Sequence, residues 1–343
     1  MTATDSALSG SRMLKRSRVL LWLLTALTAL LFLASLCIGP LLISPLTVLR
    51  HLAPSDDSTL ALIVRDIRLP RALLAVLVGA SLGSAGAALQ GLLRNPLSEP
   101  GIIGISGGAA LGAVSAFYSG IAASALWVLP ASGMFGALLA VAAIHALAGR
   151  GADILTVILA GVAINSLSGA LTTLILNLSP NPFAAYEIYF WLLGSLANRS
   201  FEHVLLALPF MLAGGALLLM TRRALDVLAL GEDSAASLGI ALNRTRAQVI
   251  AGSALAVGAA VSISGVIGFV GLVVPHVLRP WVGYRPGALL VPSALGGAAL
   301  TLAADLGTRL PLAGGELKLG VVTALIGAPF FLRLVLQSRA VHR

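Results

Sequence analysis

The sequence predicts an all-α protein that crosses a membrane many times. Hydrophobic residues make up 58% of its 343 residues, whereas Asp, Glu, Lys and Arg together make up only 10%. The mean hydropathy is +0.99, which is not typical of a soluble globular domain. Apolar runs of about 20 residues, the length needed to cross a bilayer, recur along the chain. We therefore expect one transmembrane domain over residues 1–343.

Apolar runs separated by polar or basic residues predict ten transmembrane spans. The expected spans are 19–38, 70–94, 101–118, 125–148, 154–177, 204–221, 247–264, 264–280, 287–308 and 317–336. A polar tail, residues 1–18, precedes the first span, and a signal peptide is the alternative interpretation of this region. We favour a retained span because the apolar run is long enough to cross the bilayer. The segments 39–67 and 178–203 are expected to be external.

The distribution of basic residues predicts the orientation of the spans. Ten spans place both chain ends on one side, and most Lys and Arg residues fall on that side, which makes it cytoplasmic by the positive-inside rule. The net charge of +9 is spread over span ends rather than gathered on one face, so we expect no nucleic-acid partner. The external exceptions are Arg50, Arg65, Arg68, Arg71, Arg199, Arg309 and Lys318.

Motifs for catalysis and for metal or cofactor binding are missing from the sequence. Lys15 and Lys318 are the only lysines and neither follows a glycine, so there is no Walker A loop for ATP. The 5 histidines include no pair spaced four residues apart, which leaves no zinc site. Cys37 is the only cysteine, which excludes an intrachain disulfide. We expect no enzyme activity, no metal and no cofactor.

Residues 226–239 interrupt the apolar pattern with acidic and hydroxyl side chains. The alternation predicts one or two short amphipathic helices inside a cytoplasmic segment, residues 222–246. Gly231 should separate the helices, Glu232 should favour the first turn of the second helix through the helix dipole, and Gly239 should end it. From local sequence alone, this segment is either a solvated loop or a docking site for a cytoplasmic partner.

Few polar side chains fall inside the spans. The span 154–177 is the most polar and contains Asn165, which indicates a helix beside an aqueous path, although most hydroxyls in spans bond their own backbone. Gly79 and Gly83 predict close packing of the second span against another helix. Asp305 is the only acid in a predicted span. Since an ion-driven carrier usually needs buried carboxylates or broken helices, a self-contained secondary transporter is the less favoured alternative.

Several motifs, taken together, closely resemble the FecCD-type permeases of bacterial ABC importers. They are Arg68-Leu69-Pro70-Arg71, Arg94-Asn95-Pro96-Leu97, 231–239, 265–279, Ala304-Asp305, Glu316 and 320–329. The resemblance covers residues 65–335. It implies the type II importer permease fold, with ten helices in each of two adjacent subunits and a translocation path on the axis between them. It also implies that a partner chain hydrolyses ATP, which fits the missing Walker A loop.

The same resemblance implies a set of partners and a class of substrate. The partners are a second permease subunit, expected to be a second copy of this chain, two cytoplasmic ATP-binding subunits, and a periplasmic or lipid-anchored substrate-binding protein. The complex would lie in the bacterial inner membrane, with both ends of this chain in the cytoplasm. The expected substrate is a ferric siderophore or a similar iron chelate, with haem or cobalamin as alternatives.

The resemblance also implies roles for residues on the cytoplasmic side. In the family, the segment that matches residues 231–239 packs into a cleft on the ATPase. The expected coupling residues are therefore Gly231, Glu232, Ala235, Leu238 and Gly239. The turn that contains Asn95 and Leu97 matches a constriction at the cytoplasmic mouth of the path, although a simple tight turn between two spans is the alternative. We expect Asn165 to line the same path.

Three external arginines match positions that receive carboxylates of the binding protein in the family. They are Arg68, Arg71 and Arg309. Arginine suits this task because its planar guanidinium group can hold a carboxylate with two hydrogen bonds. Anchoring by local partners, for instance of Arg309 by Asp305, is the alternative interpretation of these residues.

Overall fold

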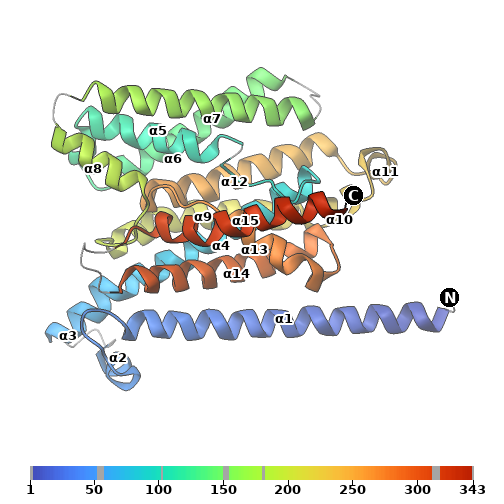
Figure 1. Ribbon diagram of the computed structural model, residues 1–343, viewed down its shortest axis with the longest axis horizontal. Helices are drawn as coiled ribbons and strands as arrows, with labels where there is room; N and C mark the ends of the chain where they lie inside the picture. Colours follow the sequence, from blue (N-terminus) through green and yellow to red (C-terminus); the bar gives the residue numbers. More distant parts are fainter. Residues whose placement is uncertain are drawn as a thin grey trace.

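The computed structural model is a bundle of long, roughly parallel helices (Figure 1). It describes residues 3–51, 58–101, 103–149, 154–179, 182–310 and 317–341, so Glu316 of the resembling motifs lies outside the described residues. Within the described residues, seven helices are long and apolar enough to cross a membrane, and three shorter apolar helices accompany them. One of these helices lies in each of the ten predicted spans, which confirms the all-α polytopic fold.

The helices that follow the predicted spans carry most of the chain. They are α1 (Ala3–Cys37), α4 (Leu69–Leu92), α5 (Ile105–Tyr118), α6 (Val128–Ala148), α7 (Ile154–Asn177), α9 (Phe201–Met220), α12 (Leu242–Ser264), α13 (Val270–Leu278), α14 (Pro286–Thr308) and α15 (Leu319–Val341). Short helices connect them: α2 (Pro45–His51), α3 (Thr59–Leu62), η1 (Ile63–Arg68), η2 (Ile121–Ala123), α8 (Pro182–Leu192), α10 (Arg222–Leu228), α11 (Glu232–Ser237) and η3 (Arg279–Val282).

The two ends of the bundle carry different connecting helices. The helices α2, α3 and α8 lie at one end, which we call the α8 end (Figure 1). The helices α10 and α11 lie at the other end, which we call the α11 end, and there α1 begins and α15 finishes. The predicted coupling segment therefore shares one end of the bundle with both termini.

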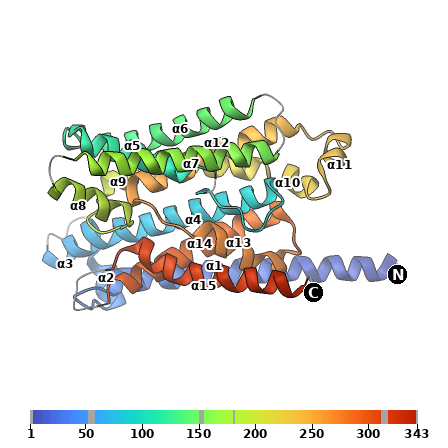
Figure 2. The same cartoon turned by 45° about the horizontal axis from the view of Figure 1, so that its top comes forward.

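Burial divides the spanning helices into an inner and an outer set. In their most apolar stretches, 72% of the residues of α4 and α12 and 67% of those of α14 are buried, against 22% for α1 and α7. Figure 2 shows α5, α6, α7 and α8 together on one side of the molecule and α1 and α15 on the other. The outer helices expose apolar side chains, as expected of surfaces that face lipid or a partner.

Small residues bring the inner helices α4 and α14 into backbone contact, in agreement with the predicted packing face. A Cβ atom added at Gly79 would overlap the carbonyl oxygen of Gly297, and one added at Gly83 would overlap that of Ser293. Close approach of this kind is typical of membrane helices, whose association depends on van der Waals packing rather than on the hydrophobic effect. We call this contact the α4–α14 seam.

Two predicted boundaries differ most from the structure. The predicted tail, residues 1–18, is helical from Ala3 and continues directly into the first span as part of α1. The predicted span 264–280 is helical only from Val270, because Gly265 and Phe269 take positive φ angles of 73° and 68° and break the helix before it. The helix in the eighth predicted span, α13, is therefore shorter than predicted and begins at Val270 rather than at residue 264.

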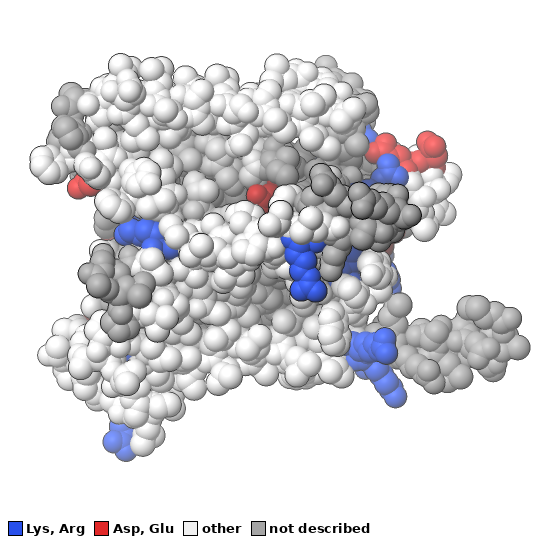
Figure 3. Space-filling model, in the orientation of Figure 1, with Lys and Arg blue, Asp and Glu red and all other residues white. Residues whose placement is uncertain are grey.

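Charge is sparse on the face of the molecule in Figure 3. Several of the described Lys, Arg, Asp and Glu side chains on this face lie toward the two ends of the bundle, an acidic and a basic side chain lie nearer its middle, and most of the remaining surface is uncharged. Sparse charge between the ends suits a bilayer, because a charged side chain at the hydrocarbon centre is costly.

Candidate coupling and docking sites

The helices α10 and α11 form the predicted pair of short helices. Gly231 separates them at φ 112°, and Gly239 follows α11 at φ 80°. Both angles lie in the region that side chains other than glycine avoid, so glycine is needed where the chain turns at each end of α11. Glu232 occupies the first turn of α11, as predicted.

The exposed side chains of this segment are apolar as well as polar. Leu230 and Leu238 are 69% and 64% exposed at the two ends of α11. Ala235, in contrast, is fully buried and packs α11 against the bundle. Of the residues expected to couple the chain to a partner, Leu238 therefore faces outward and Ala235 faces inward.

Glu232 is engaged by a residue of the same chain. Both of its carboxylate oxygens accept from Nη2 of Arg246, at 2.8 and 2.9 Å, and both side chains are partly buried. This charge-assisted pair ties α11 to the beginning of α12. The carboxylate that the sequence assigns to the coupling surface thus holds the segment in place.

A second acid of the segment, Asp226, binds the start of α14. Its Oδ1 accepts the backbone N–H of Gly287 at 2.8 Å, and its Oδ2 accepts from Nη2 of Arg285 at 2.8 Å. Sequence reasoning placed Asp226 in the segment but did not identify this role, because its partners lie about sixty residues away along the chain.

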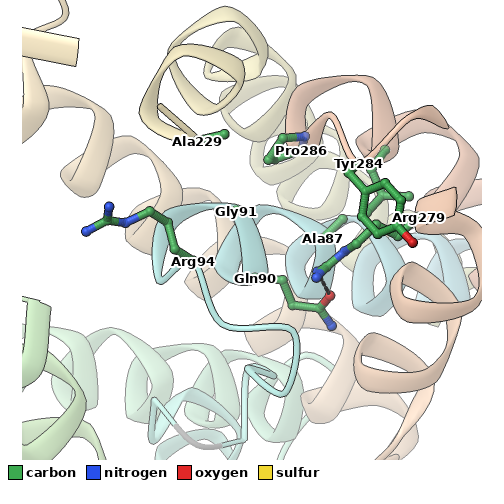
Figure 4. Close-up of a pocket in the computed structure, with 9 residues that line it drawn as sticks. Ala87, Gln90, Gly91, Arg94, Ala229, Arg279, Tyr284 and Pro286 are labelled. Carbon is green, nitrogen blue, oxygen red and sulfur yellow. Dashed lines mark hydrogen bonds between the residues drawn. The ribbon is translucent and has the colours of Figure 1, made fainter. Parts of the chain in front are cut away.

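A cavity of about 170 Å³ lies where this segment approaches α4 (Figure 4). Nη2 of Arg279 donates to Oε1 of Gln90 across it at 2.6 Å, while Nε2 of Gln90 donates to the carbonyls of Gly271 and Leu272. Figure 4 shows Arg94 pointing away from this pair. Gln90 therefore links the end of α4 to α13 and η3, close to the loop between α10 and α11.

At the α8 end, two of the predicted docking arginines share one buried carboxylate. Nε of Arg71 donates to both oxygens of Asp305 at 3.0 and 3.1 Å, and its Nη2 donates to Thr308. Nη2 of Arg309 donates to Asp305 at 2.7 Å and to Oγ of Ser35 at 2.8 Å. Asp305 is 1% exposed, so this cluster joins α1, α4 and α14 below the surface.

Arg68 is also held inside the chain. Its guanidinium group donates to the carbonyl oxygens of Leu36, Cys37 and Leu41, and the residue is only 5% exposed. Each predicted docking arginine thus has partners in its own chain. This geometry matches the alternative interpretation, in which local partners anchor the arginines. Docking remains a hypothesis, and it would require the arginines to exchange these partners for carboxylates of a binding protein.

The predicted gate turn follows α4 at the α11 end. Oδ1 of Asn95 accepts the backbone N–H of Leu97 at 2.9 Å, and Arg94 before it has a positive φ of 48°. Asn95 is exposed and Leu97 is half-buried. The turn is therefore fixed by a local side-chain hydrogen bond, a common use of asparagine in turns.

Glu99 lies after the gate turn, between α4 and α5. Burial raises the pKa of its carboxyl above the ordinary value of 4.5, while a hydrogen bond from the backbone of Phe269 acts in the opposite direction. Phe269 is the residue at φ 68° that precedes α13. The carboxyl thus connects the gate loop to the break before α13, a contact that sequence reasoning did not predict.

Asn165 lies on the exposed side of α7, close to α5. An added Cβ at Gly107 of α5 would overlap its Oδ1, so the amide packs directly against the backbone of α5. The hydroxyl of Thr173, on the same helix, donates to the carbonyl of Gly169. Thr173 therefore bonds its own backbone, as expected of most hydroxyls in spans, and the role of Asn165 remains a prediction.

Comparisons with known proteins extend over nearly the whole bundle. The model of the FecCD transport family matches residues 27–337. The chain is 40% identical to the vitamin B12 import system permease protein BtuC of Vibrio cholerae over 308 residues, which covers 88% of this chain and 89% of that protein. It is 38% identical to the hemin transport system permease protein HmuU of Yersinia pestis over 328 residues, with coverages of 94% and 96%.

A solved structure shares the fold. It is described as an inward-facing conformation of a metal-chelate type ABC transporter and superposes with a TM-score of 0.83 at 34% identity. The superposition covers 92% of this chain and 98% of that one. The chain belongs to the FecCD transport family, as a membrane permease subunit of an ABC transporter that is not itself the ATPase.

Proposed function

We propose that this permease moves a ferric siderophore or a similar metal chelate across the inner membrane, driven by a separate ATPase. The observation that carries the proposal is the outward-facing α10–α11 segment on a bundle whose sequence has no ATP-binding loop. The names of the similar proteins, which refer to vitamin B12 and hemin, support a large metal chelate as cargo. They also favour haem or cobalamin as the second candidate substrate.

In this proposal, the α10–α11 segment docks on the ATPase. Leu230 and Leu238 would enter an apolar cleft of the ATPase. Gly231 and Glu232 would set the position of α11, which presents these two leucines. Exposed leucines on a segment that is fastened to its own bundle support this role, because a rigid surface loses little conformational entropy on binding. Movement of the docked ATPase would then move the spans.

The complex would contain two copies of this chain, two ATP-binding subunits and one binding protein. The outer helices α7 and α15 expose several leucines, among them Leu159, Leu174, Leu325 and Leu332. Either lipid or a second permease subunit can cover such surfaces, and a second copy would place the path between the two chains. The α11 end, with both termini, would then be cytoplasmic.

The binding protein would dock at the α8 end. The buried cluster of Arg71, Asp305 and Arg309 supports this role only if carboxylates of the binding protein replace Asp305 as partners of the guanidinium groups. Arg68 would have to leave three backbone carbonyls. If the arginines keep their present partners, they would contribute to docking only indirectly, by holding α1 against α4 and α14.

One purification tests the assembly. The tagged chain would be isolated in mild detergent from iron-limited cells, and the proteins that accompany it would be identified by mass spectrometry. A stoichiometric ATPase and an external binding protein would support the importer, and the binding protein could then be titrated with haemin, cyanocobalamin and a ferric siderophore. A solitary chain that transports in vesicles without ATP would contradict the proposal and favour a secondary transporter.

A further inference from the structure

The carboxylate of Asp226 fastens α10 to the first turn of α14. Oδ1 accepts the backbone N–H of Gly287, which is one of the N–H groups that a helix cannot satisfy internally. Oδ2 pairs with Arg285, the residue before α14. A negative charge at this place is also favoured by the helix dipole. Asp226 thus acts as a cap supplied to α14 by a distant helix.

The backbone bond is the firmer of the two contacts. The side chain of Arg285 is 60% exposed, whereas that of Asp226 is 17% exposed. An ion pair with so exposed a partner contributes little to stability. Around the bond to Gly287, in contrast, the two helices touch, since a Cβ added at Gly287 would overlap the carbonyl oxygen of Arg222.

The rest of the segment is fixed to the bundle as well. Leu225 and Leu228 of α10 are buried at 0% and 3% exposure, and Ala235 of α11 is fully buried. Glu232 ties α11 to Arg246 of α12. The outward-facing segment is therefore seated on two different spans, α14 through Asp226 and α12 through Glu232.

The helix that Asp226 holds is itself joined to α4 along its length. Backbone contacts at Gly79 and Gly83 form the α4–α14 seam, and Asp305 of α14 binds Arg71 of α4 at the far end. Closely packed backbones leave no side chains that could repack to absorb a relative displacement. The helix α4 ends at Leu92 and leads directly into the gate turn.

We propose that Asp226 is the positioning residue that transmits movement of the α10–α11 segment to the α4–α14 pair, and through it to the turn at Asn95 and Leu97. This inference rests on the proposed function, because the docked ATPase supplies the movement. It separates two roles in the segment: Glu232 orients α11, whereas Asp226 links the segment to the helix pair that ends at the gate.

The test follows the gate turn directly in the complex of this chain with its co-purified ATPase, reconstituted in nanodiscs. The chain carries Cys37→Ser and Arg94→Cys, so that a membrane-impermeant maleimide reports on the turn from an exposed position while the bond between Leu97 and Asn95 is kept. We expect trapping with ATP and vanadate to change the labelling rate about tenfold, a typical size for coupling between sites. Asp226→Ala should abolish this change while the ATPase stays bound and ATP hydrolysis stays within about twofold of that of the background.

Two further variants sharpen the result. Asp226→Asn keeps an oxygen for the N–H of Gly287 and should retain most of the change in labelling. Asp66→Asn, a matched replacement of an exposed aspartate at the other end of the bundle, should behave like the background. If Asp226→Ala does not assemble, Asp226→Ser is used in its place. Serine keeps the position polar, but its shorter side chain should not reach the N–H of Gly287 or the guanidinium group of Arg285.

The outcomes separate the inference from the function on which it rests. A full ATP-dependent change in Asp226→Ala, or in Asp226→Ser where that variant is used, would overturn the role of Asp226 and leave the importer intact. Absence of an ATP-dependent change in the background chain would overturn the proposed function and the inference together. Loss of the change in Asp226→Ala, with retention in Asp226→Asn, would support the role of Asp226.

Discussion

Both carboxylate oxygens of Glu232 lie within 2.9 Å of the same guanidinium nitrogen of Arg246. This pair joins α11 to α12, while Leu238 just beyond α11 stays 64% exposed. The short segment therefore divides its tasks between side chains. Glu232 determines where α11 sits, and the exposed leucines present an apolar surface to another molecule.

Reversing one charge of this pair should impair uptake, and reversing both should restore it. Glu232→Arg would place two cations together and displace α11, so we expect ATP-driven uptake to fall about fivefold. The double variant Glu232→Arg with Arg246→Glu rebuilds the pair and should recover most of the activity. Uptake of haemin, cyanocobalamin and a ferric siderophore into proteoliposomes measures this. A double variant as impaired as the single one would instead place Glu232 in direct contact with the partner.

Truncation of Leu238 should weaken binding of the ATPase. An exposed apolar side chain that becomes buried in a cleft is a typical interface anchor, so Leu238→Ala should lower the affinity by about tenfold. The control is Leu310→Ala, which removes a 63% exposed leucine from the opposite end of the bundle. Binding of the purified ATPase to nanodiscs by surface plasmon resonance gives both values. Equal affinities of the two variants would show that Leu238 is not part of the docking surface.

Removal of the buried carboxylate of Asp305 should destabilise the α8 end. Asp305→Ala leaves Arg71 and Arg309 without their shared anion, and breaking a buried ion pair costs about 3–5 kcal/mol. The apparent Tm in detergent should therefore fall well below that of Asp66→Ala, which alters an exposed aspartate. A Tm unchanged from that of the unmodified chain would show that the cluster contributes nothing to stability.

Docking of a binding protein through Arg68 and Arg71 makes a different prediction. The variant Arg68→Glu with Arg71→Glu should weaken binding of the binding protein, and the affinity of the unmodified chain should fall steeply with salt concentration. Because both arginines hold local partners, the variant must first be shown by its Tm and elution volume to be folded. If a folded variant binds the binding protein with unchanged affinity, these arginines serve only to anchor their own chain.

The raised pKa of Glu99 predicts a pH-dependent stability. A carboxyl that holds its proton more tightly when folded contributes stability that is fully present below its ordinary pKa of 4.5 and is lost as the pH rises through the folded pKa. Glu99→Gln does not titrate and can still accept the bond from Phe269, so it should melt at a higher temperature than the unmodified chain, by a margin that grows as the pH rises above 4.5. The exposed Glu202→Gln is the control. A margin independent of pH would contradict the assignment.

Hydropathy was enough to locate every spanning helix, because the bilayer imposes a length and an apolar composition on each of them. The glycines at 231 and 239 also marked the ends of α11 correctly, since few other residues adopt their backbone angles. These features depend on local sequence alone. The beginning of α13 follows a positive φ angle at Phe269, which a residue of this type rarely adopts, so the sequence-based boundary was wrong by several residues.

The partners of the charged residues were harder to predict. Nothing near Asp226 in the sequence points to Gly287, and nothing near Arg68 points to the carbonyls at and just after the end of α1. Such pairs depend on how distant helices pack. The pair of Asp305 and Arg309 could be predicted from the sequence, because a spacing of four residues brings side chains together on a helix.

The α4–α14 seam limits how this chain can vary. A methyl group at Gly79 or Gly83 would meet a carbonyl oxygen of the facing helix, and no side-chain rotation could relieve the overlap. The two helices would have to separate, drawing the Asp305 cluster apart at one end and the helix start held by Asp226 at the other. Positions without any chemistry of their own would thus be among the least tolerant of substitution, and a chain that lost them could keep every charged residue and still fail to transport.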